Sequence, residues 1–270
     1  MIKNFPKNVV SPATLVETEH FTVRLAENHE DVEGAQRLRY EVFNIEQGRG
    51  LRGSVRYGID FDEFDEYCLH LMAIEKASGK LVGTYRAHLG CVANSAKGFY
   101  SSREYEIHGL YKIADKCIEL GRTCVAPDYR SGAVVALLWA GITELIVRAR
   151  LTYMLGCVSL DDTDPALGWA LYEYIGKKHP KCGEFNVVPR PGFKLERPHE
   201  REIKKILDDE SGLRKKIPPI FKGYLRLGGY ICGEPALDRE FGTIDFFIVV
   251  DVNKVPARYK NHFNYKESKD

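Results

Sequence analysis

Residues 119–132 read ELGRTCVAPDYRSG and decide the fold. The first part of this stretch is typical of an apolar strand that ends at Pro127, and an apolar helix is predicted from about residue 132 to residue 150. Backbone N–H groups at the start of a helix, together with its positive dipole end, favour a bound phosphate. We therefore expect this turn to hold a phosphorylated ligand; an ordinary capped helix is the alternative. The expected binding residues are Val125, Arg130, Ser131, Gly132 and Ala133.

Strands and helices alternate on both sides of this stretch. Apolar periodicity predicts strands at 20–25, 69–74, 81–89, 117–125, 153–159 and 243–250, and helices at about 28–45, 132–150, from 164 onward and at 200–216. The segments 47–58 and 91–102 are expected to be loops, and 220–233 is left without an assignment. This order predicts an α/β fold with a mixed sheet.

Composition excludes several classes of protein. The 270 residues carry 39 Lys+Arg and 38 Asp+Glu, a net charge of +1, so nucleic-acid binding through bulk charge is excluded. A hydrophobic fraction of 44% excludes a disordered chain. The N-terminus has no apolar signal region, and the most apolar run, 133–147, is shorter than the roughly 20 residues of a spanning helix. We expect a cytoplasmic protein, with peripheral contact with the inner membrane face left open.

Cysteine and histidine spacing gives no sign of a metal site. The 7 cysteines are widely spread without a C-x-x-C pair, and the 8 histidines lack H-x-x-x-H spacing. We expect neither a bound metal nor a disulfide framework. Cys124, close to the turn, remains an alternative nucleophile.

The pattern Val125-x-Pro127-x-Tyr129-Arg130-x-Gly132 resembles the thioester-binding turn of the GNAT acyltransferase superfamily, with Ala133 and Val135 at its usual glycine positions. Other motifs resemble the long-chain N-acyltransferase branch, which includes ornithine lipid synthases and N-acyl amino acid synthases, and part of the set is shared with acyl-homoserine lactone synthases. These motifs are RLRYEVF at 37–43, D-x-x-D at 62–65, GTYR at 83–86, GFYS at 98–101 and ELGR at 119–122. The segments GYLRLG at 223–228 and DREFGT at 238–243 resemble extensions of family members often labelled hemolysins.

The resemblance implies a GNAT-like acyltransferase fold, with a mixed, mostly antiparallel central sheet flanked by helices. It implies an N-terminal segment 1–19, a core 20–190 and a C-terminal extension 191–270 packed on that core. The implied reaction moves a long-chain fatty acyl group from acyl carrier protein to the α-amine of a small amino acid of the ornithine or glycine type, in aminolipid biosynthesis. The donor is an acyl-phosphopantetheine thioester, with acyl-CoA as the alternative to the carrier protein, and no cofactor is tightly bound.

The chemistry needs a base for the ammonium proton and donors for the tetrahedral oxyanion. Glu119, inside an otherwise apolar strand, is the expected base, because burial would raise its pKa toward neutrality; an ordinary pairing with an arginine is the alternative. Arg122 is the expected second catalytic residue, yet alternation along a regular strand would send it to the opposite face. We therefore predict a β-bulge near Gly121 that brings both side chains to one side.

Charged residues within apolar segments need partners. Arg39 and Arg86 are such residues, and Asp62 and Asp65 are their expected partners in a polar network beneath the acceptor amino acid; a solvated acidic loop is the alternative for the aspartates. Phe43 is expected to line the acyl channel, with a plain core position as the alternative.

Three lysine-rich patches could meet an acidic carrier protein or an anionic membrane surface, or could be solvated helix faces. They are 177–178, 204–205 and 214–216. Other functions left open are lactone synthesis from S-adenosylmethionine, a short-chain acyl-CoA reaction, and a non-enzymatic, membrane-active lipid-binding protein.

Overall fold

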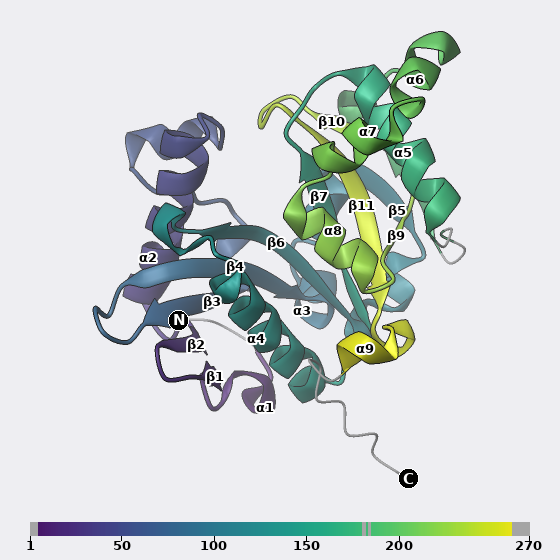
Figure 1. Ribbon diagram of the computed structural model, residues 1–270. Coiled ribbons are helices and arrows are strands. Elements are labelled where there is room, and N and C mark those ends of the chain that lie inside the picture. Colours follow the sequence, from purple (N-terminus) through teal and green to yellow (C-terminus); the bar gives the residue numbers. More distant parts are fainter. Residues whose placement is uncertain (1–4, 180–181, 183–184, 261–270) are drawn as a thin grey trace. The chain divides into compact units, whose positions relative to one another are not determined.

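The strand–turn–helix predicted at 117–150 is present in the computed structural model (Figure 1). Strand β6 (Cys117–Val125) passes through a 3-10 turn (Pro127–Tyr129) into α4 (Ala133–Ala149). Val134, Leu138, Ile142 and Leu145 of α4 are buried, spaced three or four residues apart as an amphipathic helix requires.

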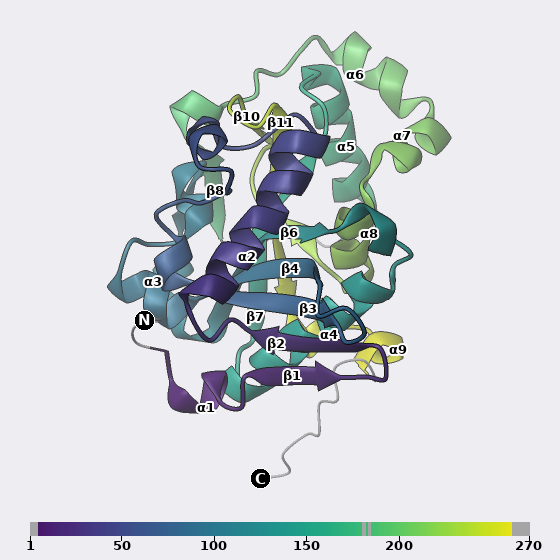
Figure 2. The same cartoon turned by 90° about the vertical axis from the view of Figure 1, so that its left-hand side faces the viewer.

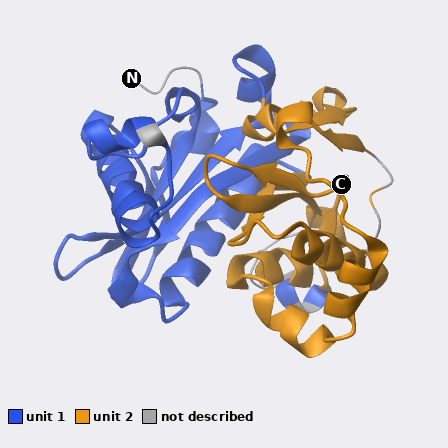
Figure 3. Cartoon of the chain, turned by 90° about the horizontal axis from the view of Figure 1, so that it is seen from above, with its two compact units in different colours: residues 1–98, 115–152, 257–270 blue, residues 99–114, 153–256 orange. Residues whose placement is uncertain are grey.

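The structure describes residues 5–179, 182 and 185–260, which divide into two units (Figure 3). Unit 1 is drawn from 1–98, 115–152 and 257–270, and unit 2 from 99–114 and 153–256. The chain passes between the units repeatedly, so both units contain segments from distant parts of the sequence. The expected division into 1–19, 20–190 and 191–270 follows the family resemblance instead and stays a prediction.

Unit 1 contains an antiparallel sheet in the order β1 (Thr14–Glu17), β2 (Phe21–Leu25), β3 (Leu69–Glu75), β4 (Leu81–Leu89) and β6. The strands β3 and β4 form the predicted hairpin. The remaining α-helices of the unit are α1 (Lys7–Val10), α2 (His29–Tyr40), α3 (Gly90–Ser95) and α9 (Ala257–Lys260).

Helices α2 and α4 cover opposite faces of the unit 1 sheet (Figures 1 and 2). Asn28 caps α2 by accepting a hydrogen bond from the Asp31 N–H, as its place before the helix predicts. Helix α4 packs closely against β4 at Gly83, where a Cβ atom would come within 2.7 Å of the Val134 side chain. The absence of a side chain at Gly83 allows this close packing. A six-residue π-helix, Glu41–Glu46, continues α2 and leads into the segment 47–58.

Unit 2 is built around β11 (Thr243–Asp251), which is buried along its whole length. Strand β11 pairs antiparallel with three strands: β7 (Tyr153–Leu160), β10 (Ala236–Asp238) and β9 (Tyr230–Ile231). A separate two-stranded antiparallel sheet pairs β5 (Tyr105–His108) with β8 (Asn186–Pro189). The helices are α5 (Pro165–Lys178), α6 (Glu200–Leu207), α7 (Glu210–Lys216) and α8 (Pro219–Arg226). Helix α5 begins where it was predicted, and the Asp164 carboxylate caps it by accepting the Ala166 N–H.

Three local predictions were wrong. The loop expected at 91–102 contains most of α3 and a 3-10 turn at Tyr100–Arg103. The loop expected at 47–58 contains a 3-10 helix at Arg52–Arg56. The single helix expected at 200–216 is divided into α6 and α7, because the Asp209 carboxylate accepts the Gly212 N–H and starts a new helix.

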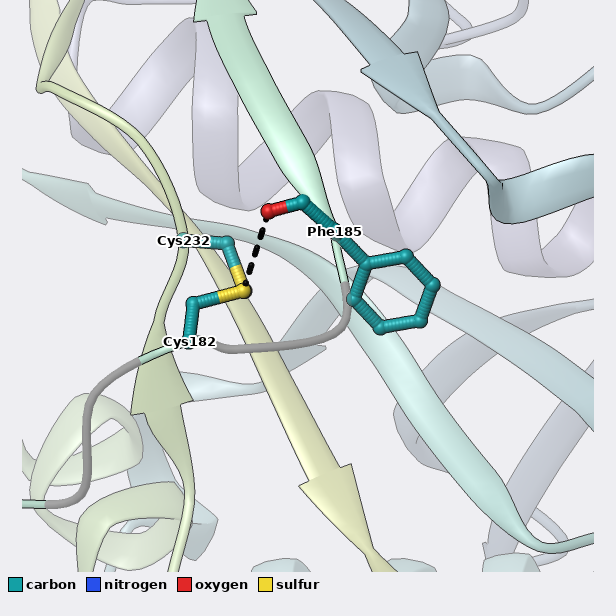
Figure 4. The surroundings of a disulfide bond; sticks show 3 residues. All are labelled: Cys182, Phe185 and Cys232. Atoms are coloured by element: carbon teal, nitrogen blue, oxygen red, sulfur yellow. Dashed lines mark hydrogen bonds between the residues drawn. A yellow bond between two sulfur atoms is a disulfide. The ribbon is translucent and has the colours of Figure 1, made fainter.

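A disulfide joins Cys182 and Cys232, which the spacing of cysteines did not predict (Figure 4). The two residues are 50 positions apart, and the fold brings their Cα atoms to 5.1 Å. The Cys182 Sγ also lies 3.5 Å from the Phe185 carbonyl oxygen. The sequence argued against a disulfide framework and missed this single pair, because such a pairing depends on which segments meet in space rather than on spacing along the chain.

Among the helices in the described part of the chain, none has both the length and the apolar character that crossing a bilayer requires.

Candidate active site

The predicted bulge near Gly121 is present where β4 pairs with β6. Thr84 lies opposite Cys124 and Arg86 opposite Gly121, so two steps along β4 match three along β6. Arg122, inside the bulge, has φ of +49°, a left-handed conformation that non-glycine residues rarely adopt. Such conformations cluster at functional sites, where the surroundings hold them in place. The bulge breaks the alternation of β6 between Glu119 and Arg122.

Glu119 is buried and lies opposite His88 of β4. The Glu119 Oε2 is 3.8 Å from the His88 Nδ1, and the ring of Phe64 packs at 6.2 Å from the His88 ring. Since His88 and Arg86 alternate along β4, they share one face of the sheet. Glu119 therefore belongs to the same face as the ion pairs of Arg86.

Arginines and aspartates form the predicted network on this face. Arg39 Nε is 2.9 Å from Asp60 Oδ1, and its Nη2 is 2.8 Å from Asp65 Oδ2. Arg86 Nη1 is 2.7 Å from Asp62 Oδ1 and 3.0 Å from Asp65 Oδ1. Arg122 approaches the same aspartates at longer range, with its Nη2 at 3.5 Å from Asp62 Oδ2 and its Nε at 3.7 Å from Asp60 Oδ1. Three guanidinium groups thus balance three carboxylates.

Asp62 and Asp65 stay ionised within the network although they are buried. Burial alone would raise the pKa of Asp65, but the charges of Arg39 and Arg86 hold it well below its usual range. Burial would also raise the pKa of Asp62, but the charges of Arg86 and Arg122, together with the Arg86 hydrogen bond, lower it. The pKa of Arg86 is raised well above its ordinary value by Asp62, against the effect of burial. Asp62, Asp65 and Arg86 therefore act as fixed charges near neutrality.

His70 contacts this network, and its lowered pKa leads us to expect that the free energy of unfolding decreases in acid. Its Nε2–H donates to the Asp65 carbonyl oxygen at 3.0 Å, and burial lowers its pKa from 6.5 to about 4. Between these two values the unfolded chain binds a proton that the folded chain does not, so stability falls as the pH drops through this window. We expect the free energy of unfolding to decrease by on the order of 2 kcal/mol between pH 7 and pH 4.5 on account of His70.

Urea unfolding at both pH values would measure this decrease. In His70→Gln the drop between the two pH values should be smaller than in the natural protein, whatever the variant's stability at pH 7. The matched control is His29→Gln, since the His29 side chain is 89% exposed and its replacement should leave the pH dependence unchanged. An identical pH dependence in His70→Gln would contradict the prediction.

The turn between β6 and α4 presents backbone that no side chain caps. Gly132 has φ of +99° and precedes α4 without a side-chain hydrogen bond to the helix, and Ser131, Gly132 and Ala133 are exposed. A Cβ atom at Gly132 would meet nothing within 4 Å. The first N–H groups of a 17-residue helix thus face open space, as a phosphate site requires.

Arg130 does not lie open at this turn. Its guanidinium forms a bidentate ion pair with Glu46, with N–O distances of 2.5 and 2.7 Å, and its Nε donates to the Val125 carbonyl oxygen at 3.0 Å. Val125 itself is buried. In this arrangement Arg130 connects the turn to the π-helix at Glu41–Glu46.

Phe43 and Cys124 belong to one apolar cluster. The half-buried Phe43 packs against a core formed by Leu38, Val42, Cys124 and Ala126. Burial raises the pKa of the Cys124 thiol to about 12, so it is not a thiolate near neutrality. This removes the alternative of a cysteine nucleophile.

Two residues of the site were missed from the sequence. Asp60 is fully buried and pairs with Arg39, although it begins an acidic run that suggests a solvated loop. His88 follows Arg86 by two positions on β4, and this spacing was the available signal, because alternate residues of a strand share a face.

Unit 2 contains a separate group of buried carboxyls. Oxygen atoms of Glu104, Asp238 and Asp245 lie within 4.8 Å of one another. Burial and the neighbouring acids raise the pKa of Glu104 well above its usual range, and burial raises that of Asp245 to about 6. We assign this group no part in the transfer reaction.

Comparison with known proteins agrees with this geometry. Residues 38–140 match the family described as the acetyltransferase (GNAT) domain. The structure is similar to that of FeeM, an N-acyl amino acid synthase from uncultured soil microbes, with a TM-score of 0.50, 11% identity, and coverage of 86% of this chain and 90% of that chain. The fold is that of a GNAT acyltransferase, and the protein is an acyltransferase.

The sequence relatives narrow this class further. The chain is 33% identical to the L-ornithine N(alpha)-acyltransferase of Agrobacterium fabrum over 253 residues, which cover 89% of this chain and 84% of the relative. It is 32% identical to that of Brucella abortus over 256 residues, covering 89% and 88%. The chain belongs to the family of L-ornithine N(alpha)-acyltransferases.

Proposed function

We propose that the protein transfers a long-chain fatty acyl group from acyl carrier protein to the α-amine of ornithine, as the first step of aminolipid synthesis. The acceptor is supported by the names of relatives that align along most of this chain. The observation that carries the chemistry is the buried pair of Glu119 and His88. Glu119 is on β6, which leads through the bulge to the uncapped start of α4, and His88 lies opposite it on β4. This geometry supplies a base and a phosphate site on one strand–turn–helix unit.

Glu119 acts as the general base in this proposal. The carboxylate takes one proton from the α-ammonium of ornithine, with His88 beside it at 3.8 Å. The neutral amine then attacks the thioester carbonyl carbon, forming a C–N bond and a tetrahedral oxyanion. Collapse of this intermediate breaks the C–S bond, and the phosphopantetheine leaves as a thiolate. The nitrogen loses its second proton as it becomes the amide nitrogen, and the thiolate accepts that proton.

Arg122 and the turn fill the remaining roles. Arg122 is the arginine with the longer ion-pair distances to Asp60 and Asp62, and we assign it to the developing negative charge beside Glu119. Arg39, Arg86, Asp62 and Asp65 form a rigid charged floor that fixes the acceptor side of the site. The backbone at Val125 and Ser131–Ala133 receives the phosphorylated arm, while Phe43 remains a candidate for the wall of the acyl channel.

The product would have one long chain on a polar amino acid, which partitions into a bilayer. Release of the product at the cytoplasmic membrane surface is therefore part of the proposal. No tightly bound cofactor is invoked.

The test is a direct assay of donor and acceptor. Purified protein is incubated with long-chain acyl carrier protein or acyl-CoA and with ornithine, glycine, lysine or S-adenosylmethionine, and products are identified by mass spectrometry. We expect Nα-acyl ornithine, formed faster from the carrier-linked donor. A lactone formed from S-adenosylmethionine would favour an acyl-homoserine lactone synthase instead. Faster transfer from acyl-CoA would show that the carrier protein is not the preferred donor. Vesicle leakage without acyl transfer would overturn the proposal.

A further inference from the structure

Exposed apolar side chains are concentrated in one short segment of unit 1. Ile45, Val55, Tyr57 and Phe61 are 68%, 66%, 56% and 42% exposed. Elsewhere among the described residues, large apolar side chains with comparable exposure are isolated in the sequence, at Tyr111, Val147 and Val188. Single exposed apolar residues are normal, but a concentration of them marks an interaction site.

This segment also carries positive charge. Residues 47–58 contain arginines at 49, 52 and 56 and no aspartate or glutamate. The Arg56 guanidinium lies 5.5 Å from the centre of the Tyr57 ring, and the Tyr57 and Phe61 rings are 5.8 Å apart in an edge-on arrangement. We call the exposed side chains of Val55, Arg56, Tyr57 and Phe61 the arginine–aromatic surface. Aromatic residues and arginine are the types enriched at protein interfaces.

An ion pair places this segment beside the expected donor site. The segment extends beyond the end of α2 (Figures 1 and 2), and the π-helix that leads into it carries Glu46. Glu46 holds Arg130 of the turn before α4 in a bidentate pair. The arginine–aromatic surface therefore begins nine residues after Glu46, the end of the π-helix that is fastened to the turn.

The geometry points to the arginine–aromatic surface as the docking site of the acidic carrier protein that delivers the acyl thioester; this inference rests on the proposed function. The thioester arm is covalently attached to the carrier, so the carrier must contact the enzyme near the turn that receives the phosphate. An acidic partner complements the arginines, and its apolar contacts cover Val55, Tyr57 and Phe61. An anionic membrane would match the same charges, but only a carrier must dock beside the turn.

The lysine-rich patches are the competing surfaces, and they lie in unit 2. One of them is already engaged within the protein, since Lys178 Nζ is 2.7 Å from Glu210 Oε2. The test compares Arg56→Glu combined with Tyr57→Ser against the matched control Lys215→Glu, which reverses an exposed charge of α7. Each protein is assayed with acyl carrier protein and with a small acyl-pantetheine thioester.

We expect the double variant to raise the KM for the carrier-linked donor by about tenfold or more, with kcat and the KM for the small thioester unchanged. Lys215→Glu should behave like the natural protein, and thermal unfolding should show that both variants are folded. Equal effects on both donors, no effect on either donor, or an effect confined to Lys215→Glu would overturn the docking surface.

Two further outcomes separate the hypotheses. If the natural protein uses only the small thioester, acyl carrier protein is not the donor, and both the proposed donor and the docking site are wrong. If it uses the carrier normally after the double substitution, while binding to vesicles of anionic phospholipid is lost, the surface binds membrane and the docking inference alone is wrong.

Discussion

Replacement of Glu119 by glutamine is expected to lower kcat for acyl transfer by about 10²–10⁴-fold, the usual contribution of a general base. The amide preserves the size of the buried side chain beside His88 but cannot take the ammonium proton. The KM for the donor thioester should change little, because the donor is proposed to bind at the turn before α4. Steady-state release of the donor thiol, followed with a chromogenic thiol reagent, measures both constants.

The matched control is Glu106→Gln, which removes a carboxylate from an exposed position of β5 and should leave kcat unchanged. Circular dichroism and thermal unfolding must show that Glu119→Gln is folded, because the residue is buried in the sheet. A folded Glu119→Gln variant that retains kcat within about twofold would show that another group removes the proton.

The second large effect is on stability. Arg39→Ala is expected to lower the free energy of unfolding by about 3–5 kcal/mol, the usual cost of removing one partner from a buried ion pair. Arg39 is 1% exposed, and its removal leaves Asp60 and Asp65 without their shortest guanidinium contacts. Urea unfolding monitored by fluorescence provides the measurement, with the slope of the transition compared between variants to confirm that the same surface is exposed.

Arg37→Ala is the control for this substitution. Arg37 lies two positions earlier in α2, and its side chain is 59% exposed where it pairs with Glu33. A solvent-exposed pair of this kind contributes less than about 1 kcal/mol. If Arg39→Ala cost no more than Arg37→Ala, the network would not be a structural support of the site.

Local features were predictable where neighbouring residues determine them. Asn28 and Asp164 cap the helices that follow them, because a side-chain oxygen can reach a backbone N–H two or three residues ahead. The bulge near Gly121 was predictable from a conflict within one strand, since two polar side chains three positions apart could not otherwise serve one site. Asp62 and Asp65 were predictable because buried arginines need counter-charges.

The failures share a different cause. Asp209 interrupts the charged segment 200–216 because a capping geometry competes with continuation of the helix, and the periodicity of the segment does not resolve that competition. Cys182 and Cys232 meet because distant strands are arranged together, which spacing along the chain does not show. The acidic run that begins at Asp60 suggested a solvated loop, but in the fold Asp60 is buried against Arg39 of α2.

The amino-acid sequence by itself determined the strand–turn–helix at 117–150, the hairpin of β3 and β4 and the identity of the charged residues at the site, because periodicity, capping and the cost of burying charge act over short distances. Tertiary structure alone decided that His88 lies opposite Glu119, that Asp60 receives Arg39, and that Arg130 binds Glu46. These pairings join segments 21 to 84 residues apart or set the register of two strands, so they follow from packing rather than from any local preference.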